Sequence, residues 1–202
     1  MPGDFHEGLF TYLDTNSIGA LKANTIMLSL PDLNDEKAMD RFYLTLGIVA
    51  SFNLNLVVLK SSEIDFSKKK EIIDLWWRNE SNGSLMALFS YLMTLSQTWA
   101  GSTIRLLKAI PMDESREQHR TEMTEIKRQA RIEADIKIVQ FKEDAYDVLK
   151  YSSGQSADFV FVSMEATDGA EAIESIKTML PKLESLPTTA LVWSNGEANI
   201  FV

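Results

Sequence analysis

The residues of this chain that could do chemistry are isolated carboxylates beside apolar runs. Asp74 lies within the strand-like run at residues 72–77, and Asp158 directly precedes a second such run. Acid–base catalysis needs a second titratable group close by, and neither aspartate has a histidine, a lysine or another acid at a suitable spacing. A Ser-His-Asp triad would have to use His119, which lies in a charged helical stretch, and no G-x-S-x-G turn is present. We therefore expect no enzyme, with Asp74 capping a loop or pairing with a backbone group.

Metal chemistry is equally poorly supported by the residue types. The chain has no cysteine, which excludes disulfides, thiolate catalysis and cysteine-based zinc sites. Its two histidines, His6 and His119, lie far apart in the sequence and have no ligands at metal-site spacing around them. We expect surface or capping roles for both histidines and no bound metal.

Composition narrows the class of protein. The 202 residues are 45% apolar and 24% charged, which suits one domain or two small halves that share a sheet. A net charge of −9 argues against a nucleic-acid binder, which needs a basic face, and against a protein lying on an anionic membrane surface. No apolar run reaches the ~18–20 residues that cross a bilayer, and the N-terminus lacks a signal-peptide pattern.

Strand-like and helix-like patterns alternate along the chain, which predicts an α/β fold with a mostly parallel sheet flanked by helices. Short apolar runs predict strands at residues 25–30, 54–59, 72–77, 103–110, 136–141, 159–164 and 189–193. Helical spacing of apolar residues or capping residues predict helices that begin near residues 35, 85, 113, 144 and 168. The helix predicted at 113–133 is strongly charged, so it either lies solvated over the sheet or binds a partner.

Two features bear on domain organisation. Residues 24–60 and 102–141 both follow the order strand, proline, helix, strand, which predicts halves at about 24–100 and 101–202 related by pseudo-duplication. Chance similarity between α/β units would produce the same pattern. Near the C-terminus, Asn195-Gly196 predicts a hairpin that ends in a strand at 199–202. Such a final strand would be an open edge through which two copies could pair.

Two adjacent tryptophans end the strand at residues 72–77. Neighbouring side chains on a strand point to opposite faces, so Trp76 and Trp77 are expected on different faces of the sheet. Both could be buried under helices, or one could contact a subunit or a membrane domain. By composition, the candidate interface residues are Trp77, Asn82 and Phe201. Asn82-Gly83 is expected to turn the chain, with Ser84 capping a helix at residues 85–95.

The segment I-D-L-W-W, followed by a polar loop with glycine and an apolar helix, resembles a recurring motif of cation–chloride cotransporters. The motif residues here are Asp74, Trp76, Trp77, Gly83 and Leu85. The resemblance extends in the family's order to residues 7–21, 24–30, 157–164 and 183–202, and so covers most of the chain. Two departures are Trp193-Ser194, where the family usually has Arg-Gly, and Glu165, where a proline is usual.

This resemblance implies a compact, prokaryote-like cytoplasmic C-terminal domain. Residues 1–23 would link it to the membrane domain, and residues 24–202 would form a regulatory α/β domain with two universal-stress-protein-like halves. The expected partners are a second copy, in a homodimer, and the transmembrane domain of the same polypeptide, at the cytoplasmic face of the cell membrane.

An alternative is a stand-alone nucleotide-binding protein of the universal-stress type. Members that bind ATP use a G-x2-G-x9-G-[ST] run whose backbone N–H groups hold phosphate. The glycines at 83, 101, 154 and 169 do not fit that spacing, and no P-loop is present. We therefore expect no cofactor; the alternative is ATP held through other backbone contacts at the strand ends.

Overall fold

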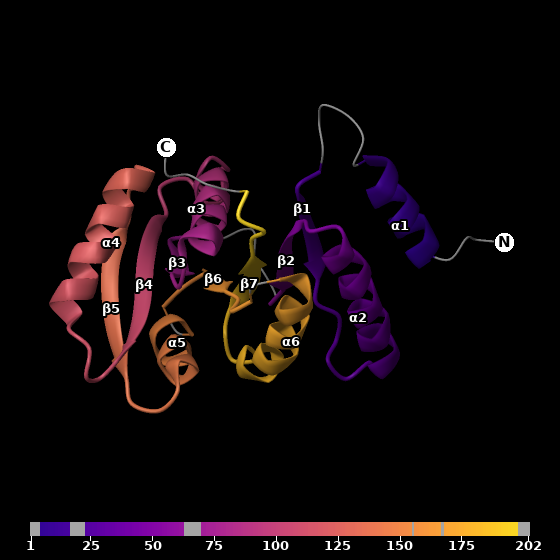
Figure 1. Ribbon diagram of the computed structural model, residues 1–202. Helices are drawn as coiled ribbons and strands as arrows, with labels where there is room; N and C mark the ends of the chain where they lie inside the picture. Colours follow the sequence, from indigo (N-terminus) through magenta and orange to yellow (C-terminus); the bar gives the residue numbers. More distant parts are fainter. Residues whose placement is uncertain (1–4, 17–22, 63–69, 155, 167, 198–202) are drawn as a thin grey trace.

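The computed structural model describes residues 5–16, 23–62, 70–154, 156–166 and 168–197. Its strands form one sheet (Figure 1), and they are β1 (Thr25–Ser29), β2 (Asn55–Lys60), β3 (Ile72–Trp76), β4 (Thr103–Pro111), β5 (Asp135–Phe141), β6 (Phe159–Ser163) and β7 (Thr188–Trp193). The helices are α1 (Phe5–Asn16), α2 (Glu36–Ser51), α3 (Glu80–Thr94), α4 (Arg116–Ala130), α5 (Ala145–Ser153), α6 (Gly169–Met179) and the short 3-10 helix η1 (Leu180–Lys182).

The strand order is β1-β2-β7-β6-β3-β4-β5, and every neighbouring pair is parallel except β2 with β7. The predicted α/β fold with a mostly parallel sheet is therefore confirmed. Strands β3 to β7 form a five-stranded parallel unit that starts at its centre. The chain runs outward from β3 through β4 to β5, then returns to β6 on the other side of β3. The strand order thus reverses between β3 and β6, and doubly wound folds commonly bind ligands at this position.

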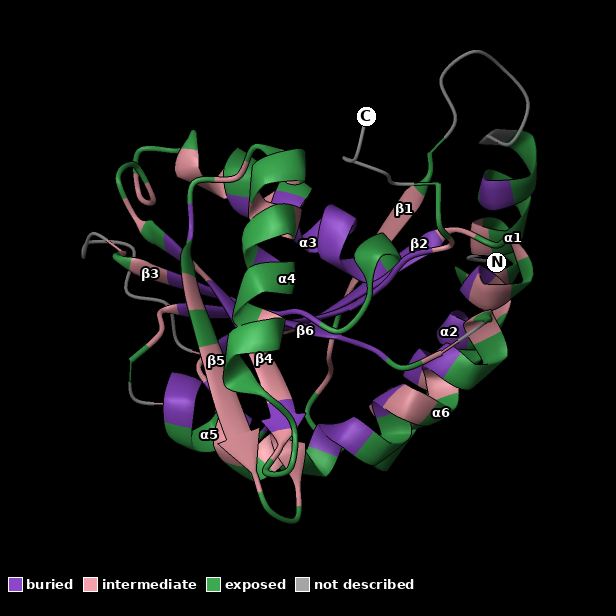
Figure 2. Cartoon of the chain, turned by 60° about the vertical axis from the view of Figure 1, so that its left-hand side comes forward, coloured by how far each residue is buried: buried purple, intermediate pink, exposed green. Residues whose placement is uncertain are grey.

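Helices cover both faces of the sheet, and each face has its own apolar core. One core joins α2, α5 and α6 to the sheet through residues such as Leu46, Leu149 and Ile176. The other joins α3 and α4 to the opposite face through Met86 and Met123. Figure 2 shows the buried strands between helices whose outward sides are exposed.

The local capping signals explain where several helices begin. The Asp35 side chain accepts a hydrogen bond from the Ala38 N–H at the start of α2, and Asp168 accepts from Ala170 and Glu171 at the start of α6. Helix α4 begins after Ser115 and ends at Ala130, where the left-handed backbone of Arg131 stops it, so it is shorter than the predicted 113–133.

The start of α3 differs from the expectation. Residues 82–84 do not form a turn and a cap, because the helix has already begun at Glu80. Asn79 is the cap, and its side chain accepts a hydrogen bond from the Asn82 N–H at 2.9 Å. The Ser84 hydroxyl lies inside the helix, buried, with no hydrogen-bond partner among the described residues.

The predicted domain boundaries do not divide the sheet. Helix α1 falls within the predicted linker, and its Leu13 is buried against the core that contains α2. Strand β3 of the first predicted half lies between β4 and β6 of the second, so both halves share one sheet. The duplication itself stays a prediction, and the strand of the predicted C-terminal hairpin lies outside the described residues.

Candidate functional site

Asp74 lies at the centre of a buried polar cluster between the sheet and α5. Its side chain is fully buried, and the register of β3 and β4 places it opposite Arg105. The Arg105 guanidinium donates from Nε to Asp74 Oδ1 at 2.5 Å and from Nη2 to Oδ2 at 2.7 Å. This two-pronged geometry is the strongest pairing that an arginine and a carboxylate make.

Two further residues complete the cluster and attach α5 to it. The Ser153 hydroxyl donates to Asp74 Oδ2 at 2.5 Å, and it accepts from Trp76 Nε1 at 2.9 Å. The last turn of α5 is therefore tied to β3 and, through Asp74, to β4. The expectation that Asp74 caps a loop or pairs with the backbone is wrong. Asp158 has that role, because its carboxylate accepts from the Glu71 and Ile72 N–H groups.

Trp77 and Gly83 form the matching contact on the opposite face. Trp77 points under the first turns of α3 and is 3% exposed. A Cβ atom at Gly83 would lie 2.6 Å from Cε2 of the Trp77 indole and closer still to Cζ2 and Cη2. Gly83 is thus required by the close approach of an aromatic ring, and Leu85 packs into the same core. The five motif residues join helices to both faces of the central strand.

Asn82 hydrogen-bonds to the carboxyl ends of two parallel strands, β6 and β7. Its Nδ2 donates to Ser163 Oγ at 2.9 Å and to the Met164 carbonyl at 2.8 Å, and its Oδ1 accepts from the Ser194 N–H at 2.7 Å. One carboxamide thereby joins α3 to the ends of β6 and β7. Beside it, Arg78 and Glu165 form an ion pair. A hollow of about 270 Å³ adjoins this pair at the carboxyl ends of β3 and β6, where doubly wound folds commonly hold ligands.

Two of the candidate interface residues lie inside the chain. Trp77 and Asn82 are 3% and 2% exposed, so a partner cannot reach either side chain in this structure. Aromatic and polar residues near a loop are common in interfaces, but here both residues pack α3 onto the sheet. Phe201 lies outside the described residues.

The two histidines lie on different helices and hold local polar contacts. His6 Nε2 lies 3.3 Å from Thr45 Oγ1, while both ring nitrogens of His119 contact carboxylates, those of Glu114 and Glu122. Among the residues with described positions, no group of three or more histidine, cysteine or acidic residues could hold a metal ion.

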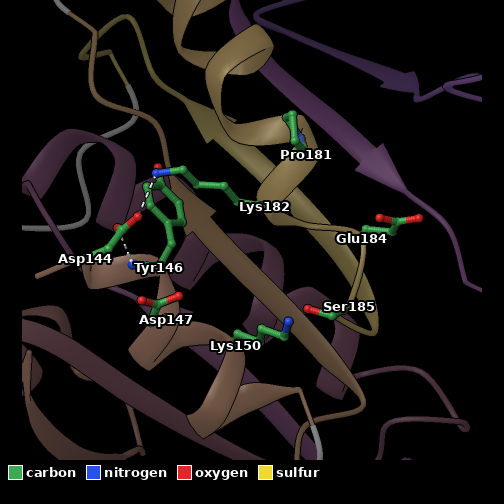
Figure 3. Close-up of a pocket in the computed structure, with 8 residues that line it drawn as sticks. All are labelled: Asp144, Tyr146, Asp147, Lys150, Pro181, Lys182, Glu184 and Ser185. Atoms are coloured by element: carbon green, nitrogen blue, oxygen red, sulfur yellow. Dashed lines mark hydrogen bonds and ion pairs between the residues drawn. The ribbon is translucent and has the colours of Figure 1, made fainter.

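A polar hollow of about 330 Å³ lies between α5 and the segment that follows α6 (Figure 3). Lys182 extends over the Tyr146 ring, 4.4 Å from its centre, and pairs with Asp144 at 2.9 Å. The Tyr146 N–H and the Lys182 ammonium lower the pKa of Asp144. Burial raises the pKa of the Tyr146 phenol, and the nearby cations Arg78 and Lys182 oppose that rise only in part.

The raised pKa of Tyr146 predicts a late-ionising phenol and a loss of stability at high pH. The unfolded phenol titrates near pH ~10, so above that pH the unfolded state has fewer protons than the folded state. The free energy of unfolding should therefore fall as pH rises from about 10 towards the folded-state pKa. Tyrosinate absorbance of the wild type minus that of Tyr146→Phe measures the phenol directly. A difference that titrates at or below pH ~10 would contradict the prediction.

The sequence pointed to the central aspartate, but its partners were missed. Arg105 could have been found, because the predicted strands at 72–77 and 103–110 start in register and place residue 105 beside residue 74. Ser153 carries no comparable signal, since its position depends on how α5 crosses the sheet.

None of the helices in the described part of the chain is both long and apolar enough to cross a bilayer.

Known structures share this fold. The cytoplasmic domain of a prokaryotic cation chloride cotransporter is similar with a TM-score of 0.63 and 14% identity, over 97% of this chain and 73% of that one. A universal stress protein from Archaeoglobus fulgidus DSM 4304 has a TM-score of 0.55 and 9% identity, and the match covers 86% of this chain and 62% of that one. A putative universal stress protein from Pseudomonas aeruginosa UCBPP-PA14 has a TM-score of 0.52 and 14% identity, over 93% of this chain and 68% of that one. At these identities the likeness is one of fold.

Family membership rests on the sequence match. The family model described as Solute carrier family 12 matches residues 49–151, which include all five motif residues and the Asp74–Arg105 pair. The match confirms the resemblance to the cation–chloride cotransporters. Because it spans half of the chain, this protein belongs to solute carrier family 12.

Proposed function

We propose that this chain is a cytoplasmic regulatory and dimerisation domain of a cation–chloride cotransporter. It would be non-catalytic and would control or assemble a separate transmembrane ion-transport domain of the same polypeptide. The family match over residues 49–151 is the observation that carries this proposal. The fold shared with a cotransporter cytoplasmic domain supports it.

The polar groups of the described residues also support a structural role over a chemical one. The Asp74 carboxylate is fully buried and already paired with Arg105 and Ser153, so it has no free face for a substrate. Asn82 is likewise occupied on both its amide and its carbonyl side. Both residues connect helices to the sheet, as expected of a domain that controls or assembles a transmembrane domain.

Two experiments test the proposal. The natural reading frame should contain, upstream of this domain, a block of apolar segments of about 20 residues each. A frame without such a block would refute the proposal. In proteoliposomes, ion flux of the intact transporter should change in rate or control when residues 24–202 are deleted, while the ion pathway itself survives.

A stand-alone nucleotide binder is the second candidate, favoured by the likeness to universal stress proteins. Calorimetry with ATP separates the two functions. We expect no binding heat, because the chain lacks the glycine run whose backbone N–H groups hold phosphate in the members that bind ATP. Saturable binding at micromolar strength would favour the nucleotide binder.

A further inference from the structure

Helix α3 and Leu95, the residue that caps its C-terminus, carry an apolar stripe on the outward side of the helix. Leu88, Tyr91, Leu92 and Leu95 are 42%, 58%, 49% and 65% exposed. Their spacing of three, four and seven residues places them on one face of a helix. The opposite side of α3 is buried against β3, β6 and β7. A helix that is apolar on all sides is normally covered on all sides, and here one side is open.

The stripe continues into the largest of the hollows described for this structure. This hollow has a volume of about 670 Å³ and lies between α3 and the end of α4. Leu88 and Tyr91 form one wall, while Ile104 and Ile132 contribute apolar surface across from them. Arg131 and Glu133 also line it, so charges of both signs lie beside an apolar floor. An apolar centre with a charged border is the usual anatomy of a protein interface.

The charge pattern indicates what covers this surface. No charged residue occurs from position 81 to position 104, although 24% of the chain is charged. A chain with a net charge of −9 repels its own copies over most of its surface. Two copies can meet with least repulsion where the charge is absent. A contact about a twofold axis also requires a surface that complements itself, and an apolar helix face does so.

We propose that two copies of this chain associate through α3, with the stripe of Leu88, Tyr91, Leu92 and Leu95 packed against the same stripe of the second copy. The inference rests on the dimer in the proposed function and assigns its surface. Four large side chains about half exposed offer roughly 400 Å² per copy, about half of the ~800 Å² that a standard interface buries on each side. The walls of the adjoining hollow supply further apolar area.

Light scattering after size-exclusion chromatography tests the surface with a matched pair of variants. Leu92→Glu places a charge in the stripe, whereas Leu44→Glu places the same charge on α2 at a leucine that is 56% exposed. Across a dilution series, the wild type and Leu44→Glu should give a mass near twice 22.8 kDa. Leu92→Glu should dissociate at concentrations at least about 30-fold higher than the wild type.

The absence of cysteine from the chain provides a second measurement that does not depend on mass. Leu92→Cys should form an intermolecular disulfide under mild oxidation, because residues near a twofold axis bring their Cα atoms within ~7 Å of each other. Leu44→Cys should remain reduced. Circular dichroism of each variant establishes that it is folded, which is expected at exposed positions.

The outcomes separate this inference from the function on which it rests. A dimer that Leu92→Glu leaves intact and Leu92→Cys does not crosslink would overturn the α3 surface and leave a dimerisation domain in place. A wild type that is monomeric throughout, with no crosslink, would overturn both the surface and the dimer. Neither result touches the link to a membrane domain, which the natural reading frame tests.

Discussion

Arg105→Met is expected to lower the free energy of unfolding by about 3–5 kcal/mol, because it leaves the Asp74 carboxylate buried without its charged partner. Asp74 is fully buried, and the Arg105 guanidinium is its partner at both oxygens. Methionine has a similar length and no charge, so the change isolates the electrostatic contribution from the loss of packing. Urea unfolding followed by circular dichroism at neutral pH measures it.

Two variants control this prediction. Asp74→Leu combined with Arg105→Met removes both charges and should be less destabilising than Arg105→Met alone, since no uncompensated buried charge remains. Arg128→Met removes an arginine whose partner, Glu125, is on the surface of α4, and it should leave the unfolding midpoint unchanged. The idea fails if Arg105→Met unfolds at the same urea concentration as Arg128→Met.

The position of Asp74 also shows how far the sequence alone could lead. Local patterns predicted both strands that hold the ion pair, and parallel pairing of consecutive strands in an α/β unit brings residues 74 and 105 together. The third member, Ser153, could not be predicted, because it reaches Asp74 only through the crossover of α5 over the sheet. The cap expected at Asp74 occurs at Asp158.

Long-range pairing limits the prediction of the fold in the same way. The seven described strands and their mostly parallel arrangement follow from short apolar runs alternating with helices. The insertion of β7 between β2 and β6, antiparallel to β2, does not. Strands β2 and β7 lie more than a hundred residues apart in the sequence, and neither carries a local signal for its neighbour.

The dipeptide Asn82-Gly83 illustrates a local signal that tertiary structure overrides. Asn-Gly is a strong turn pattern, and it predicts a turn at these two residues. In the structure both residues are helical. Asn79 caps the helix ahead of them, Asn82 hydrogen-bonds to the ends of β6 and β7, and Gly83 admits the Trp77 ring. Glycine is needed at position 83 because Trp77, six residues earlier, packs against it, and a turn pattern carries no information about such a contact.

The contact between Gly83 and Trp77 predicts that two glycine-to-alanine substitutions in helices change the free energy of unfolding in opposite directions. Gly47 lies on α2, and no atom lies within 4 Å of the place that an alanine Cβ would take there. Gly47→Ala should therefore raise the free energy of unfolding by roughly 0.5–1 kcal/mol through helix preference. Gly83→Ala receives the same helix preference, yet its methyl group would overlap the Trp77 indole. Overpacking of a rigid core costs about 1–3 kcal/mol, so a net loss of stability is expected.

A double-mutant cycle assigns the loss at Gly83 to the indole itself. Trp77→Leu removes the ring carbons that the methyl group would meet, so Gly83→Ala should cost less in that background than in the wild type. Thermal unfolding of the wild type, the two single variants and the double variant gives the coupling free energy between positions 77 and 83. Gly47→Ala is measured beside them. If Gly83→Ala stabilises the wild type as Gly47→Ala does, then α3 can move away from the sheet and Trp77 does not fix its approach. If the predicted coupling is found, the closeness of α3 to the central strand depends on one glycine, and any larger residue there would displace the helix that carries the apolar stripe.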